Sequence, residues 1–302
     1  METYTKKKSI SALAEGDVID DIFAVKIKKG FQPYVKGFCF ELLITDNSGK
    51  TLEYKYWGGN DEHKVRTLYE SIKSDNVIHV QGKVSIYNNK LQLATNEPML
   101  VEVLQDGQYA QQDFIKPAKK DINQMYAELQ QIIAQVIHPE IKQLLEKIFS
   151  EKGEQFKQHP GAIEIHHNWV GGLIQHTLEI VHFCQTACQL YPALDKDLLL
   201  AGALLHDIGK LEELEMTSRI KGTVKGQLVG HLILSTVYLS QKLAESSLPE
   251  EMKNKLLHLV VSHHGHQEYG SPKEPMFPEA IILYYADELS SKAAEILEYV
   301  ED

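Results

Sequence analysis

Short runs of alternating apolar and polar residues occupy the first third of the chain. Between residues 16 and 104 five such runs follow one another, with turn-forming stretches at residues 46–50 and 87–90. Alternation with a period of two residues is typical of strands that bury one face. A stretch of helical periodicity, residues 61–74, falls between the third and fourth runs. Five strands with a helix in this position have the order of an OB-fold barrel, which we predict for residues 1–104.

The rest of the chain has helical periodicity. The polar stretch 105–120 lacks any period, and we predict that it is a linker. After it, Asp121 is placed to cap a first helix and Pro139 to open a second. Further helices are expected around residues 169–190, 198–211, 228–246, 250–263 and 278–299. The sequence therefore predicts an α+β protein of two domains, in which the barrel is followed by an all-α helical bundle at residues 121–302.

The composition indicates where in the cell the protein is located and shows that the two halves of the chain differ in charge and histidine content. The 302 residues are 43% hydrophobic and 24% charged, as in an ordinary globular protein, and no apolar stretch reaches the roughly 18 residues that span a bilayer. Three cysteines form neither an even set nor a CxxC pair. We expect a cytoplasmic protein without a membrane partner.

The net charge of −11 argues at first against a nucleic-acid partner. However, residues 1–110 have a net charge of only −1, whereas the remainder has −10 and 12 of the 14 histidines. An acidic, histidine-rich half is typical of an enclosed cation site, although surface carboxylates alone give the same sum.

The run LLLAGALLHDIGKLEEL is the strongest local signal of chemistry. It places adjacent His206 and Asp207 on an apolar helix, where the imidazole can hold one metal ion while the carboxylate bridges to a second. Lys210 lies one turn further on, where a cation can reach a substrate phosphate. Gly209 allows close packing of the segment. An HD dipeptide alone remains weak support for a metal site.

Four further candidate ligands make the metal site the favoured interpretation. They follow one another at intervals of 24 to 32 residues, each about one helix and a loop, and each lies in apolar sequence. Helical bundles build dinuclear sites from one inward side chain per helix. Because imidazole and carboxylate ligands suit Mn²⁺ or Fe²⁺ better than Mg²⁺, we expect two Mn²⁺ ions, with Fe²⁺ or Mg²⁺ as alternatives. The predicted ligands are His176, His206, Asp207, His231, His263 and Asp287.

Several other residues are candidates for catalysis or substrate contact. Two consecutive helical side chains cannot both face one metal ion unless the helix breaks, which Gly265 could cause. We therefore choose His263 as the ligand and assign a catalytic role to His264, beside Asp207 and Lys210. The pair His166 and His167 could approach the scissile phosphate or be ordinary loop histidines. Tyr269 and Ser271 lie in a loop rich in Gly and Pro that is either a substrate wall or a rigid turn.

Cations lie beside aromatic residues on the predicted strands. Such a mixture suits a platform on which bases stack while phosphates are neutralised, although many of these rings would be barrel core in any small barrel. The candidates for single-strand contact are Lys28, Phe31, Tyr34, Lys36, Tyr56 and Trp57.

These motifs together resemble a known family. HHNWVGGLIQHT, LLHDIGK, GQLVGH, SHHG and EYGSP, with the late Asp287, are similar to the HD-domain 3′-to-5′ exoribonucleases of the YhaM group, which have an OB-fold before the HD domain. The resemblance extends from residue 16 to 292. It implies Mn²⁺-dependent removal of nucleotides, as nucleoside 5′-monophosphates, from the 3′ end of single-stranded RNA and also single-stranded DNA. It places the six predicted ligands on the superfamily's metal positions and Lys210 on the lysine of its HDxGK motif.

Two departures and two alternative functions qualify this resemblance. Ser290 stands where a second acidic residue is expected and Lys225 where an acidic residue is common, and we expect neither to touch the ligand set. An HD phosphohydrolase of mono- or cyclic nucleotides would not need a barrel that grips a strand. A non-catalytic protein that binds single-stranded or replication-origin DNA would not need a complete ligand set. A homo-oligomer is left open by the sequence.

Overall fold

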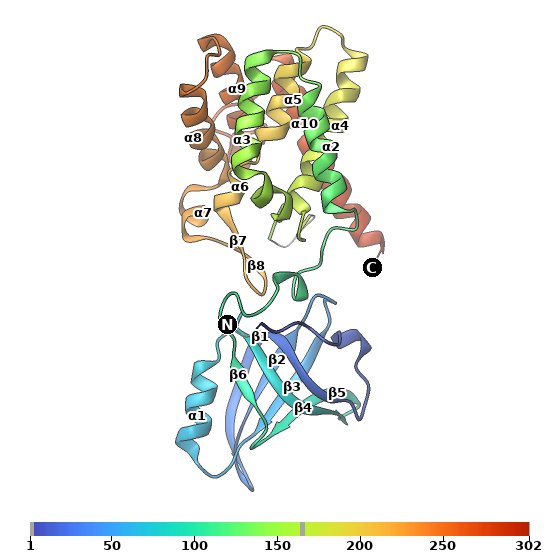
Figure 1. The fold of residues 1–302 in the computed structure, drawn as a ribbon, viewed down its shortest axis with the longest axis vertical. Helices are drawn as coiled ribbons and strands as arrows, with labels where there is room; N and C mark the ends of the chain where they lie inside the picture. The colour runs from blue at the N-terminus through green and yellow to red at the C-terminus, as the bar shows by residue number, and fades with distance from the viewer. Residues whose placement is uncertain (1–2, 164–166, 302) are drawn as a thin grey trace. The chain divides into compact units, whose positions relative to one another are not determined.

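The computed structural model describes residues 3–163 and 167–301, which form two compact units (Figure 1). One unit comprises Met1–Lys116 and Met216–Arg219, and the other comprises Pro117–Glu215 and Ile220–Asp302. His166, a candidate from the sequence, lies outside the described residues.

The first unit is a closed five-stranded barrel, as predicted. Its strands are ordered β1-β2-β3-β5-β4, and β4 pairs with β1 to close the sheet. β3 and β5 are parallel, whereas the other barrel pairs are antiparallel. This order, with a helix between the third and fourth strands, is that of an OB-fold. The elements are β1 (Val18–Tyr34), β2 (Gly37–Thr45), β3 (Thr51–Trp57), α1 (Glu62–Ser71), β4 (Val77–Tyr87) and β5 (Lys90–Asn96).

One long strand closes the barrel. The first part of β1 pairs with β4 as far as Ala24, and the remainder pairs with β2. Register shifts after Val25 and Lys28 bend the strand, as bulges do at barrel corners. The bend turns the apolar side of β1 inward, where Phe23, Phe40 and Tyr54 are fully buried.

The N-terminal unit contains two features in addition to the predicted barrel. A short strand, β6 (Val101–Val103), adds to β4 beside the five predicted strands. The 105–120 segment, predicted as a linker, contains a 3-10 turn, η2 (Gln111–Asp113), and the buried residue Phe114. Phe114 packs in a small apolar cluster with Leu104, so this part of the segment belongs to the N-terminal unit.

The second unit is built of helices around α5. Every residue from 198 to 205 of α5 is buried, and α5 contacts α4, α9 and α10. Side chains of Asp121 and Asp195 cap α2 and α5, and Pro139 begins α3. The helices are α2 (Ile122–Ala134), α3 (Pro139–Gln158), α4 (Gly172–Leu190), α5 (Lys196–Leu205), α6 (Lys210–Glu213), α7 (Val224–Val229), α8 (His231–Ala244), α9 (Glu250–Ser262) and α10 (Pro278–Glu301).

Two details of this unit differ from the prediction. The helix expected at residues 198–211 ends at Leu205, and residues 206–209 form a turn before α6. The expectation that every element after Asp121 is helical is wrong, because β7 (Leu214–Met216) and β8 (Ile220–Gly222) pair as a hairpin. Strands of three residues are too short to show a period in the sequence.

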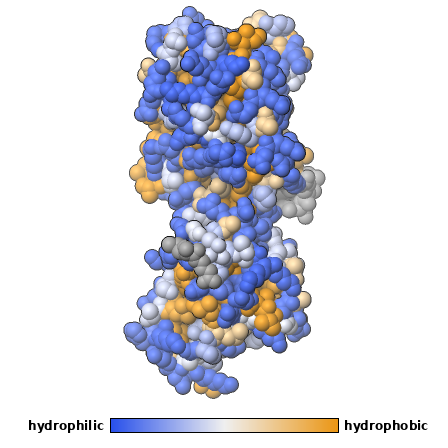
Figure 2. Space-filling model, in the orientation of Figure 1, coloured by the Kyte–Doolittle hydropathy of each residue, from blue (hydrophilic) through white to orange (hydrophobic). Residues whose placement is uncertain are grey.

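The surface is mostly polar on the face shown in Figure 2, where hydrophobic residues form scattered groups. No helix within the described ranges is long and apolar enough to cross a membrane.

Candidate metal centre and substrate surface

The HD turn is held against α8 by a glycine. A Cβ on Gly209 would lie 2.4 Å from the carbonyl oxygen of His231 and equally near the backbone nitrogen of Ser235. The amide of Gly209 also donates a 2.8 Å hydrogen bond to the hydroxyl of Ser235. Only glycine permits this approach, which brings Asp207 next to the start of α8.

Asp207 lies at the centre of the candidate site. One carboxylate oxygen, Oδ2, is 3.2 Å from Nε2 of His206 and 3.6 Å from Nε2 of His176. The other, Oδ1, is 3.5 Å from Nε2 of His231 and 3.6 Å from Nε2 of His263. Burial disfavours the charged carboxyl group, but Lys210 and His206 outweigh it and hold the pKa of Asp207 well below its usual range. A buried carboxylate thus faces histidines on both sides.

The structure brings all six predicted ligands together in two groups around this carboxylate. His176 on α4 and the HD pair form the first group, in which the three ligand atoms lie within 4.8 Å of one another. Asp287 on α10 adjoins this group, with Oδ1 at 3.1 Å from Nε2 of His176. His231 and His263 belong to the second group.

The second group contains both His263 and His264, whereas the sequence favoured His263 alone. α9 ends at Ser262, and Gly265 has a φ of +76°, which the sequence allowed only as an option. Because the helix ends before the pair, the two rings are not splayed by helical geometry. Nε2 of His264 lies 3.2 Å from Nε2 of His231. His264 therefore lies where it could hold a metal ion together with His231 and His263.

The hydrogen bonds of the imidazoles determine which nitrogen carries the proton. Nδ1 of His206 lies 2.8 Å from the carbonyl oxygen of Ala203, and Nδ1 of His263 lies 2.6 Å from the carbonyl oxygen of Val260. Nδ1 of His264 lies 3.0 Å from the carbonyl oxygen of Tyr269. A carbonyl oxygen can only accept, so each Nδ1 donates its hydrogen. In the neutral rings Nε2 then has a free lone pair that points into the site.

His231 is oriented in the same way by a carboxylate. Its Nδ1 lies 2.9 Å from Glu213, which also accepts the backbone N–H of His231. Burial raises the pKa of Glu213, but the bonds with His231 outweigh it and lower that pKa overall. Nε2 of His231 consequently faces Nε2 of His264 at 3.2 Å.

This donor set fits divalent cations. Two ring nitrogens 3.2 Å apart need a proton or a metal cation between them, because two facing lone pairs would repel each other. Burial lowers the pKa of His264, which disfavours a second proton on that ring. In addition, Nε2 of His206, Nε2 of His263 and Oδ1 of Asp207 are buried and make no hydrogen bond, although buried polar atoms normally have partners.

A chain of hydrogen bonds supports His176 from behind. Its Nδ1 lies 3.1 Å from Oγ of Ser290, whose hydroxyl donates a 2.8 Å bond to Glu179. Since that hydroxyl proton is used, Ser290 accepts from Nδ1 of His176, and Nε2 of His176 faces Asp287 and Asp207. His167 and Gln175 also bond the Glu179 carboxylate. Burial disfavours its charge, but these bonds outweigh the burial and lower the pKa of Glu179 to about 2.

We expect Ser290→Ala to weaken metal binding about 10- to 100-fold, as loss of such outer partners does elsewhere. Glu179→Gln should act in the same direction, because the amide cannot accept all the same bonds. Isothermal titration of the metal-free protein with Mn²⁺ measures this. Ser291→Ala, the neighbouring serine on α10, is the control, and equal affinities in both serine variants would contradict the role.

Several predicted contact residues occupy other places than expected. His167 is only 1% exposed and packs against the predicted ligand His176 with ring centroids 5.1 Å apart, so its side chain is not open to direct contact with substrate. Ser271 is equally buried, whereas Tyr269 remains 59% exposed. Ser290, expected to stay clear of the ligand set, hydrogen-bonds His176, one of the predicted ligands. Burial and long-range packing, which no local pattern encodes, decide these cases.

Lys210 places a cation beside the shared carboxylate. Its Nζ lies 2.7 Å from Oδ2 of Asp207 and donates a 2.8 Å bond to the carbonyl oxygen of Gly161. Burial disfavours its charge, but the carboxylates of Asp207 and Asp287 outweigh it and raise the pKa of Lys210. The ammonium group therefore stays charged at neutral pH.

We expect metal affinity to increase with pH. Burial disfavours a charged His206, but Asp207 outweighs it and raises the pKa of this histidine. Below this raised pKa, a proton on Nε2 of His206 competes with the metal ion. Binding of Mn²⁺ should therefore be weaker, and release more protons, at pH 6 than at pH 8. Burial lowers the pKa of His176 and of His263 to about 4, so neither competes in this range. Titrations with Mn²⁺ in buffers of different ionisation enthalpy measure this, and pH-independent affinity would contradict it.

The barrel surface keeps part of the predicted platform. Trp57 is half-buried, with its ring 4.7 Å from that of Tyr34 and Nζ of Lys55 at 4.3 Å from its centroid. Nζ of Lys28 lies 3.9 Å from the ring of Tyr69.

Phe31 is also half-buried, with Arg66 over its ring at 4.3 Å, and Lys36 is exposed. Tyr56 is only 5% exposed and stacks on Phe40, so it is core and cannot stack on a base. Cations near aromatic rings were the sequence signal, and Arg66 was missed because it lies on the helix.

An OB-fold barrel in one unit, and in the other histidines and aspartates gathered around an HD turn, define a metal-dependent HD-domain enzyme. The HD domain family matches residues 173–292. The 3′-5′ exoribonuclease YhaM of Bacillus pumilus is 32% identical over 290 residues, which cover 94% of this chain and 88% of that protein. YhaM of Bacillus subtilis is 32% identical over 286 residues with the same coverage. The chain therefore belongs to the YhaM family of 3′-5′ exoribonucleases.

One of the solved structures similar to this chain is the HD domain of the L. monocytogenes phosphodiesterase PgpH. It is 14% identical, with a TM-score of 0.31, and the match covers 50% of this chain and 73% of that one.

Proposed function

We propose that this protein is a Mn²⁺-dependent exoribonuclease that removes nucleoside 5′-monophosphates one at a time from the 3′ end of single-stranded RNA, with single-stranded DNA as a second substrate. The observation that supports this most directly is the gathering of six histidine and aspartate side chains about Asp207, in a chain related to YhaM over most of its length. We propose the cytoplasm as its location, since its three cysteines are unpaired.

The two groups would hold one divalent ion each and share Asp207. His176, His206 and Asp287 would complete the first site, and His231, His263 and His264 the second. Mixed imidazole and carboxylate donors favour Mn²⁺, with Fe²⁺ next and Mg²⁺ least. When bound, the ions would supply Lewis-acid activation of water and neutralise charge on the phosphate.

The chain's own side chains complete the reaction. The oxygen of a water molecule forms a bond to phosphorus, the bond from phosphorus to the 3′ oxygen of the preceding nucleotide breaks, and that oxygen takes up a proton. Lys210 stays charged beside Asp207 and can offset negative charge that develops on the phosphoryl oxygens. We assign His264 to metal binding and no longer to proton transfer, because its Nδ1 is engaged with a carbonyl oxygen.

The barrel would bind the strand upstream of the cleaved bond. Trp57 and Phe31 offer partly exposed rings, and Lys28, Lys36 and Arg66 offer positive charge for phosphates. Such a module is of use to an enzyme that acts on a polymer and of little use to one that acts on single nucleotides. This favours RNA over mono- or cyclic nucleotides as the substrate.

Incubation with 5′-labelled single-stranded RNA and Mn²⁺ tests the proposal. We expect a ladder that shortens from the 3′ end, release of nucleoside 5′-monophosphates, and no reaction in the presence of a chelator. Internal cuts, products with 3′ phosphates, or hydrolysis of cyclic nucleotides in preference to RNA would contradict it. A duplex of the same sequence serves as the control and should be degraded far more slowly.

A further inference from the structure

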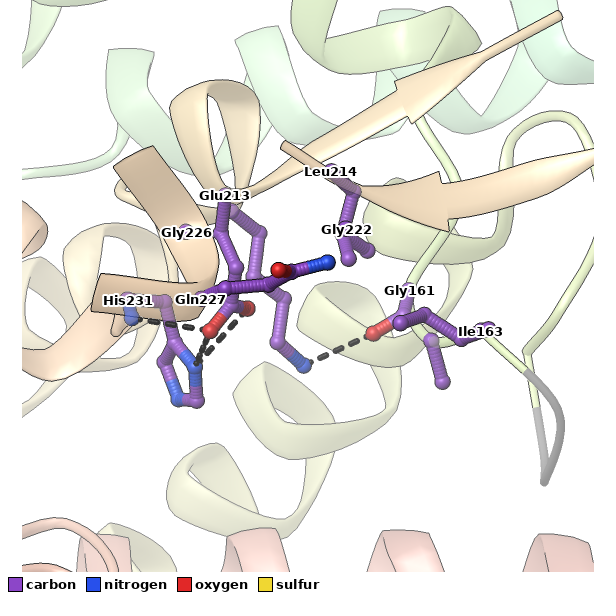
Figure 3. A pocket seen from close by; sticks show the side chains of 10 residues that line it. Gly161, Ile163, Glu213, Leu214, Gly222, Gly226, Gln227 and His231 are labelled. Carbon is purple, nitrogen blue, oxygen red and sulfur yellow. Dashed lines mark hydrogen bonds and ion pairs between the residues drawn. The ribbon is translucent and has the colours of Figure 1, made fainter. Parts of the chain in front are cut away.

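A cavity of about 290 Å³ lies beside the candidate metal centre within the helical unit (Figure 3). His231, a candidate ligand, and Lys210, which contacts Asp207, are part of its lining. The cavity therefore begins where a scissile phosphate would bind. Its volume is near the lower end of small-molecule sites, roughly 300 Å³, which suits one nucleoside and not a longer stretch of strand.

Apolar and amide groups form the walls away from the metal centre. Figure 3 shows Glu213 and Gln227 on the side of His231, with Gly161 and Ile163 opposite. Leu214, from the start of β7, adds an apolar side chain, and Gln227 on α7 is exposed. These walls offer contact to a planar group that enters between them.

Gly222 on β8 keeps this space open. A Cβ at this position would lie 3.5 Å from Cγ of Gln227 and 3.9 Å from Cδ1 of Ile163, so a side chain would point between the two walls. Both distances are ordinary contacts, and the φ of Gly222 is outside the left-handed region. The backbone therefore does not require glycine here, and a larger side chain would fold but fill the cavity.

The charges of the lining show which part of a nucleotide fits. Of the described residues that line the cavity, Lys210 and Glu213 are charged apart from the histidine, and they pair with Asp207 and His231. No charged side chain of this described lining lies between Ile163 and Gln227. These residues offer no cation to a further phosphate and suit a neutral base and sugar.

We propose that this cavity binds the nucleoside of the 3′-terminal nucleotide while its 5′ phosphate lies at the metal centre. The base lies between Ile163 and Gln227, and the space opened by Gly222 admits it. Because the amide of Gln227 can present either its N–H group or its oxygen, and apolar contact does not distinguish bases, the cavity accepts all four bases. This inference rests on the proposed exoribonuclease function and identifies the substrate group that its site holds.

Two RNAs and three variants test the cavity. One 5′-labelled RNA has an ordinary 3′ end, and the other ends in an abasic nucleotide. Removal of the first residue is timed with the Mn²⁺-loaded full-length protein. We expect the unmodified protein to remove the abasic residue about tenfold more slowly, since contact with one base contributes that order of binding. Gly222→Leu should slow removal of the ordinary residue by a similar factor and abolish the difference.

Gln227→Ala should reduce the preference for the ordinary end in part. Lys221→Leu is the matched control, because it places the same side chain one residue away on the same strand, and its preference should be unchanged. Melting temperature and metal content show whether each variant is folded. If Gly222→Leu is not, Gln227→Ala decides, since its side chain is exposed. Equal removal of both ends by the unmodified protein, or a full preference in the variants, would overturn the inference.

Failure of the proposed function gives a different result. If the unmodified protein shortens neither RNA, the exoribonuclease proposal fails, and binding of AMP to the Mn²⁺-loaded protein then tests the cavity by calorimetry. AMP binding that is lost in Gly222→Leu and kept in Lys221→Leu would support a nucleoside site. No binding of AMP to the unmodified protein would overturn it.

Discussion

Asp207→Asn should lower the rate of RNA degradation by about a thousandfold or more and remove metal from both groups. This carboxylate contacts His206 and His176 through one oxygen and His231 and His263 through the other. An amide keeps the shape but has no charge and only one oxygen, so it could not serve both groups, and the one oxygen that remains would be a weaker ligand. Loss of metal-ion catalysis removes several kcal/mol of transition-state stabilisation, which corresponds to this factor.

Metal analysis after reloading with Mn²⁺, together with single-turnover degradation rates, measures both effects. Glu212→Gln is the control, because it removes a carboxylate from the same segment of the chain. The Glu212 carboxylate pairs with Lys225 and is not part of the candidate ligand groups. It should retain two ions per chain and full activity. An Asp207→Asn protein that binds one ion with unchanged affinity would show that the carboxylate is not shared.

His263→Ala and His264→Ala should each reduce bound metal from two ions to one. Both residues belong to the second group with His231, and each directs Nε2 into the site because its Nδ1 donates to a carbonyl oxygen. Loss of a residue that contacts the metal ion directly should lower activity at least about a hundredfold. That factor is the upper end of the effect seen when a residue that only supports a ligand is lost. The two variants should behave alike.

Metal stoichiometry and degradation rates distinguish this from a single-ligand site. His182→Ala is a matched control, since His182 is exposed on α4 and pairs with Glu128. If His264→Ala kept two ions and lost only the rate, His264 would serve proton transfer, as the sequence first suggested. If His263→Ala alone kept two ions, His264 would be the sole ligand of the pair.

The sequence was a good guide to the residues that gather around Asp207 and a poor one to their surroundings. Histidines in apolar sequence at helix-length intervals were sufficient to find the residues that meet around Asp207. The partner of His176 was not foreseeable, because Ser290 lies 114 residues away and resembles any helical serine. Tyr56 and His167 were misassigned because an aromatic or histidine near a functional residue shows no sign of its burial in the local pattern.

What the sequence determined by itself is therefore whatever has a local period or a characteristic side chain. Alternation of apolar residues specified a five-stranded barrel, apolar spacing specified the helices, and the chemistry of imidazole and carboxylate specified a metal site. Tertiary structure alone decided that α9 ends before His263 and His264, so that both belong to one group. It also decided which nitrogen of these two rings faces the site, and that Gly222 leaves a cavity open nearby. These depend on contacts between residues far apart in the chain, where packing and burial set the geometry.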